Sequence, residues 1–237
     1  RPVMIYVHGG ALVAGDKVWY KGSLYANIGD HFASHGIITV IINYRLVPDV
    51  QYPGGAADIQ HAREWVYRNI SRTEFGAGDP EGVVVVGHSA GGLHVATNLC
   101  LYPPEARRKL NLNTQKYSSN PPPTPPRRRP PIAGIVFIST PFEFISTPAP
   151  APPHPTHSHS HSHSHSHSHS HSHSHAPTSS HTQFHTALQA YYGTPRLDDV
   201  HGLSPLGLMM SANIPDDSPL LDPRSLPCLV VLAQYDP

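Results

Sequence analysis

Val83–Gly92, VVVVGHSAGG, is the stretch that decides the fold. Four consecutive valines are β-branched and apolar, as in a strand buried on both faces of a parallel sheet. Gly87 and Gly91 bracket Ser89 with the G-x-S-x-G spacing, which is typical of a serine at a cramped strand-to-helix turn. The stretch therefore predicts a strand, a sharp turn and a helix over about 90–101. The free N–H groups and positive dipole end of that helix would face the serine oxygen.

Four further apolar runs predict the other strands of the same sheet, over residues 3–7, 37–43, 132–139 and 228–232. Amphipathic helical stripes over 24–36 and 56–70 separate the early strands. Strands that alternate with helices of this length favour βαβ units and a mostly parallel sheet with helices on both faces. At 237 residues, we predict one α/β domain over 1–237.

Composition excludes several classes of partner. Lysine plus arginine equals aspartate plus glutamate at 16 each, so no basic face for nucleic acid is predicted. No apolar run approaches the roughly 18 residues of a membrane span. Cys100 and Cys228 are expected to be buried free thiols and not a disulfide framework. No signal peptide is visible, so a cytoplasmic location is the default expectation, and the sequence leaves the oligomeric state open.

Two low-complexity inserts interrupt the pattern, at 103–131 and 148–180. The first is rich in proline and arginine and reads as a loose loop. The second contains strict His-Ser alternation over 157–175, which lacks the fixed geometry of a defined metal site. Residues 181–222 resemble a lid segment with local helix. Four apolar residues there are expected either to line an acyl pocket or to pack in the core: Leu206, Leu208, Met209 and Met210.

Two charged residues are predicted to be structural. Asp58 is expected in the first turn of the helix over 56–70, where a carboxylate complements the helix dipole. Arg45 lies in the loop before that helix. We expect it to form an ion pair that pins the loop.

The candidate catalytic residues follow from what a serine nucleophile needs. A hydroxyl requires a neighbouring base, a group that orients the base, and donors for the tetrahedral oxyanion. Ser89 is the predicted nucleophile. Gly9 and Gly10 directly follow a strand, so their N–H groups, with that of Ala90, are the predicted oxyanion donors. Asp236, after the last strand, is placed to orient a histidine.

Taken together, these motifs resemble the α/β-hydrolase fold, and more closely the hormone-sensitive-lipase-like esterases, especially fungal members. The resemblance rests on residues 8–10, 43–48, 52–58, 87–92 and 235–237. It implies hydrolysis of carboxylic esters with small to medium acyl chains. It implies a small-molecule ester as the partner and neither a metal nor an organic cofactor.

The sequence also departs from that family. Ala11 replaces the third glycine of the usual oxyanion motif, and HGGA is similar to the motif of formamidases and feruloyl-esterase-like hydrolases. The family's chain order is serine, acid, histidine, but no residue follows Pro237, whereas His185 and His201 precede the acid. We therefore expect an internal fragment with impaired activity. The open alternatives are an amidase or arylformamidase, a catalytically dead binding module, and metal buffering by the His-Ser tract.

Overall fold

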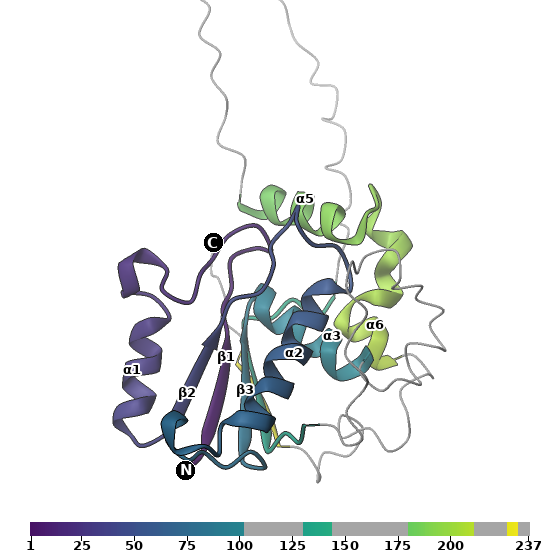
Figure 1. Ribbon diagram of the computed structural model, residues 1–237. Coiled ribbons are helices and arrows are strands. Elements are labelled where there is room, and N and C mark those ends of the chain that lie inside the picture. Colours follow the sequence, from purple (N-terminus) through teal and green to yellow (C-terminus); the bar gives the residue numbers. More distant parts are fainter. Residues whose placement is uncertain (102–129, 144–179, 211–226, 232–237) are drawn as a thin grey trace, which may run out of the picture.

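The sheet is five-stranded and entirely parallel, with strand order β2-β1-β3-β4-β5 (Figure 1). The computed structural model describes residues 1–101, 130–143, 180–210 and 227–231. The strands are β1 (Val3–Val7), β2 (Ile38–Ile42), β3 (Val83–His88), β4 (Gly134–Ile138) and β5 (Cys228–Val231). This architecture confirms the predicted α/β class. The His-Ser tract and nearly all of both inserts lie outside the described residues.

Side chains of β1 alternate between the two faces of the sheet, as a strand period of two requires. Val3, Ile5 and Val7 belong to one buried cluster, which also contains side chains of α2 (Gly54–Asn69) and α3 (Ala90–Leu101). Met4 and Tyr6 belong to a second cluster, against which α1 (Ala26–Ser34) packs. Both faces are therefore covered, as the sequence predicted.

A third apolar cluster joins the later helices to the start of α3. These elements are α5 (Ser180–Tyr192), the 3-10 helix η4 (Leu197–Leu203) and α6 (Pro205–Met210). Tyr191 and Leu208 are buried in this cluster together with Ala90 and Leu93. Figure 1 shows α5 lying across the end of the molecule where the central strands finish. Two further 3-10 turns, η1 (Tyr20–Gly22) and η2 (Thr73–Phe75), lie in connections.

Several sequence expectations need correction. β5 is exposed along its length and not buried, because it pairs only with β4 among the described strands and belongs to none of the three apolar clusters of the described residues. Cys228 is accordingly exposed, whereas Cys100 is buried as predicted. Asp58 lies beyond the first turn, because α2 begins at Gly54.

The lid-like segment contains the local helices that the sequence predicted. Leu208 is buried in the third cluster, while Met210 is 78% exposed. Across the described ranges, every helix is too short or too polar to traverse a bilayer.

Candidate active site

Ser89 occupies a strained turn between β3 and α3. Its φ is +50°, a left-handed conformation that costs a non-glycine residue roughly 1–2 kcal/mol. The turn is fixed on both sides: the Ser89 N–H donates to the Ile138 carbonyl at 2.8 Å, and the Ser89 carbonyl accepts from the Gly92 N–H at 3.0 Å. The sharp strand-turn-helix geometry predicted from the valine run and the two glycines is therefore present.

Two glycines allow this turn to be so tight. A Cβ added to Gly87 would lie 2.5 Å from the Gly92 Cα, and one added to Gly91 would lie 2.5 Å from the Val7 carbonyl oxygen. Real Cβ atoms do not approach other atoms so closely, so only glycine fits at either position. The first turn of α3 is thereby brought against the end of β1.

The turn that follows β1 packs directly on Ser89. A Cβ added to Gly9 would lie 3.1 Å from the Ser89 Cβ. Gly10 has φ +134°, and Ala11 has φ +51° in the left-handed region. The Gly9 N–H donates to the Tyr25 hydroxyl at 3.1 Å. Within the described ranges, the N–H groups of Gly10 and Ala90 form no hydrogen bond and remain available to a ligand.

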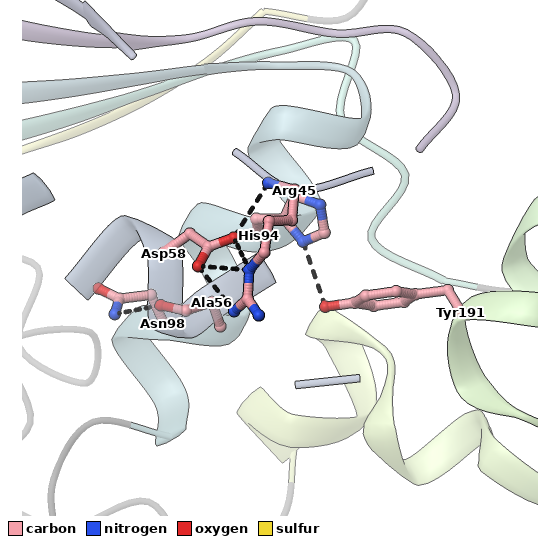
Figure 2. A network of polar contacts seen from close by, with 6 residues as sticks. All are labelled: Arg45, Ala56, Asp58, His94, Asn98 and Tyr191. Atoms are coloured by element: carbon pink, nitrogen blue, oxygen red, sulfur yellow. Dashed lines mark hydrogen bonds and ion pairs between the residues drawn. The ribbon is translucent and has the colours of Figure 1, made fainter. Parts of the chain in front are cut away.

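Arg45 pins its loop to α2, as the sequence predicted (Figure 2). The Arg45 Nη2 lies 2.8 Å from Asp58 Oδ1, and the Arg45 backbone N–H donates to Asp58 Oδ2 at 3.0 Å. The loop that follows β2 is therefore held by one carboxylate that binds both a side chain and a main-chain group.

Asp58→Asn is expected to lower the free energy of unfolding by about 1 kcal/mol. The effect stays small because the Arg45 side chain is half exposed, so solvent screens the charge. Urea unfolding at neutral pH measures this change in the free energy of unfolding. The matched control is Glu74→Gln, whose partner Arg72 is equally exposed and which should change stability little. Equal losses in the two variants would contradict the pinning role.

A buried group of rings joins α3 to the turn after β1 and to α5. His94 is fully buried on α3, and its Nδ1 lies 3.3 Å from the Tyr191 hydroxyl of α5 (Figure 2). Burial lowers the pKa of His94 to about 3, so the imidazole is neutral. The Tyr44 hydroxyl donates to the His8 carbonyl at 2.9 Å, and the two rings stack at 4.5 Å. Burial also lowers the pKa of His8.

Polar side chains also join α2 to α3. Asn98 donates to the Ala56 carbonyl at 3.0 Å (Figure 2). It also accepts from Arg63 at 2.7 Å. Arg63 in turn donates to the Pro130 carbonyl at 2.7 Å. These bonds fix α3, which begins directly after Ser89, against α2 and against the segment that precedes β4.

Among the described residues, neither of the two alternative bases bonds to Ser89, and the predicted acid is not described. Asp236 lies outside them. His185 is on α5, and His201 in η4 is half exposed with its Nε2 3.6 Å from Glu143. In this part of the chain, neither histidine forms a hydrogen bond with Ser89. No cluster of three metal-ligating side chains occurs among the same residues.

An open apolar groove of about 450 Å³ lies along α5. Its lining residues come from α5 and from the loops after β1 and β2: Val13, Val47, Pro48, Thr182, Gln183, Thr186, Ala187 and Ala190. None of the four apolar lid residues named from the sequence lines it. Leu208 instead packs in the core.

A parallel sheet with helices on both faces, and a strained serine turn between β3 and α3, define an α/β-hydrolase fold. The chain belongs to the BD-FAE family, whose model matches residues 1–184.

Curated relatives match a shorter part of the chain. It is 37% identical over 115 residues to Carboxylesterase 3B of Mus musculus, covering 45% of this chain and 18% of the relative. It is 40% identical over 113 residues to para-nitrobenzyl esterase of Bacillus subtilis (strain 168), covering 42% and 21%. The matches thus span about a fifth of the length of these relatives.

Two solved structures similar to this chain come from lactobacilli. A lipase/esterase from Lactobacillus plantarum has a TM-score of 0.48 and 17% identity, covering 98% of this chain and 79% of that one. Esterase B from Lactobacillus rhamnosis has a TM-score of 0.45 and 24% identity, covering 60% and 39%.

Proposed function

We propose that the protein is a carboxylic-ester hydrolase with Ser89 as its nucleophile. The observation that carries the proposal is the strained turn at Ser89, with φ +50°, packed against Gly9 of the turn after β1. Strain at a reactive side chain is typical of functional sites. The curated relatives support an ester as the substrate, because they include proteins named carboxylesterase and para-nitrobenzyl esterase.

The geometry supports a two-step acyl transfer. Ser89 Oγ attacks the ester carbonyl carbon while a base takes the hydroxyl proton, and the carbonyl oxygen gains the negative charge. We assign the N–H groups of Gly10 and Ala90 as the hydrogen-bond donors to this oxyanion, because the Gly9 N–H already donates to the Tyr25 hydroxyl. Collapse expels the alcohol, which takes the proton from the base. Water then hydrolyses the acyl-enzyme by the reverse proton path.

The remaining parts of the mechanism are proposed from the sequence. Asp236 is the proposed orienting acid, and in the family's chain order its histidine follows it. Esters with small to medium acyl chains are proposed as substrates from the family resemblance, and the open apolar groove along α5 is the candidate acyl site. Placement among the hormone-sensitive-lipase-like esterases, and among fungal ones, also stays a prediction from the motifs.

The test is covalent labelling of the 237-residue chain with a fluorophosphonate probe, combined with hydrolysis of p-nitrophenyl butyrate. Because no histidine follows Asp236 in these 237 residues, we expect slow labelling of Ser89, located by peptide mass, and weak hydrolysis of the ester. Ser89→Ala should show neither label nor serine-dependent hydrolysis. Ser71→Ala, an exposed serine after α2, is the matched control and should behave as the unmodified chain. Persistent labelling in Ser89→Ala, or none in the unmodified chain, would refute the proposal. Matched N-formyl anilides distinguish ester from amide preference.

A further inference from the structure

The Tyr25 hydroxyl bridges the two halves of the candidate site. It lies 3.1 Å from the Gly9 backbone nitrogen and 3.1 Å from His88 Nδ1. A backbone N–H can only donate, so the phenol oxygen accepts from Gly9 and its own hydrogen is free to donate to His88. One buried side chain thus joins the turn after β1 to the residue preceding Ser89. Tyr25 is 2% exposed.

The backbone at Tyr25 is strained in a way that serves this bridge. Its φ is +64° and its ψ −48°, and the Ala26 N–H donates to the Leu24 carbonyl at 2.8 Å. Together these values describe a γ-turn with positive φ, which is rare and unfavourable for a side-chain-bearing residue. Such strain persists only where surrounding contacts compensate for it.

Those contacts are rings that surround the phenol. The Tyr25 centroid lies 5.8 Å from that of Tyr6, 5.7 Å from that of His8 and 6.3 Å from that of Trp19. The ring is therefore packed by β1, by the turn and by the following loop. Its hydroxyl is held at one place.

We propose that Tyr25 is a positioning residue for the ester hydrolysis proposed above, on which this inference rests. Its hydroxyl fixes the Gly9 amide, and thereby directs the next N–H group, that of Gly10, towards the place where the oxyanion forms. The same hydroxyl holds His88 and so sets the separation between the Gly9 turn and the nucleophile turn. An oxyanion donor acts only when it is aimed in advance, so this separation governs the rate and not the affinity.

The environment of His88 supports the direction of the hydrogen bond. Burial and the neighbouring His8 lower the pKa of His88, which favours the neutral imidazole, and its Nδ1 can accept when the ring proton is on Nε2. Burial raises the pKa of Tyr25, so its hydroxyl keeps the proton that it donates.

The first test needs no substrate. Long-range nitrogen NMR of the unmodified chain at pH 7.5 should show His88 as the tautomer with its proton on Nε2 and Nδ1 as acceptor. A proton on His88 Nδ1 would overturn the inference. In Tyr25→Phe, which keeps the ring, amide hydrogen exchange at Gly9 should accelerate by about 10-fold or more. Unchanged exchange would equally overturn it.

The second test separates positioning from a structural role. Tyr25→Phe should lower kcat for p-nitrophenyl butyrate by about 10- to 100-fold while KM stays within about 2-fold. Tyr20→Phe, an exposed tyrosine five residues earlier in the same loop, is the control and should leave both constants unchanged. An unchanged kcat in Tyr25→Phe would contradict the positioning role of Tyr25 and leave the proposed function standing. If the unmodified chain showed no Ser89-dependent hydrolysis, the proposed function would be wrong, and so would this inference.

Discussion

Lowering the pH from 7 to 4 is expected to reduce the free energy of unfolding by about 3 kcal/mol through His94 alone. His94 is fully buried, and its pKa is about 3 in the folded protein against an ordinary value of 6.5. The unfolded chain therefore binds a proton at His94 as the pH falls below 6.5, whereas the folded protein does not. Stability is lost across the window from pH 6.5 down to about 3.

Urea unfolding at pH 7, 5.5 and 4 measures this loss, with His94→Gln as the test variant. Carboxylates also titrate in this range. The informative quantity is therefore the difference between the pH-dependent loss of unfolding free energy in the unmodified chain and the smaller loss expected in His94→Gln. His61→Gln, an exposed histidine on α2, is the matched control and should lose as much as the unmodified chain. Equal pH dependence in all three proteins would show that His94 accepts a proton in the folded state.

Gly91→Ala is expected to lower the free energy of unfolding by about 3 kcal/mol or more, and to abolish the serine-dependent activity proposed for the site. The added methyl group would lie 2.5 Å from the Val7 carbonyl oxygen and 2.8 Å from the Val7 carbonyl carbon. Both atoms belong to the backbone of a central strand, so no side-chain rotation relieves the clash. Either β1 or the first turn of α3 must shift.

Thermal and urea unfolding of Gly91→Ala give the size of this effect. Gly202→Ala is the control, because nothing lies within 4 Å of its added Cβ and its φ is not positive. That substitution should change stability little. A Gly91→Ala protein as stable as the Gly202→Ala protein would mean that α3 does not approach β1 as described.

The core of the fold and the sharp turn at Ser89 were predictable from the sequence, because each depends on local pattern. The run over 83–86 is apolar at every position, and Gly87 and Gly91 mark the turn by their spacing alone. A βαβ order then dictates a parallel sheet, which the structure confirms. Arg45 was likewise predicted to pin its loop, although nothing in the sequence specified Asp58 as its partner.

Other features depend on contacts between distant segments and could not be predicted. An apolar run such as 228–231 is compatible with both a buried strand and an edge strand. Its exposure could therefore be learned only from the strand order of the sheet. Tyr25 carries no local signal in the sequence, because the two partners of its hydroxyl, the Gly9 N–H and His88 Nδ1, come from distant segments. Asp236 lies outside the described residues, so its predicted role stays a prediction.

Several strained residues lie near the carboxyl ends of the strands. This strain limits whether the site could be transferred to another protein scaffold. Ala11, Leu12, Tyr25, Ser89 and Ser139 all have positive φ and lie in loops after strands or beside them. At roughly 1 kcal/mol each, their combined strain is comparable with the net stability of a small domain. The loops hold their shape only because the sheet and its helices restrain them. Transplanting the short motifs onto another scaffold would carry over the residues without the conformations that align them.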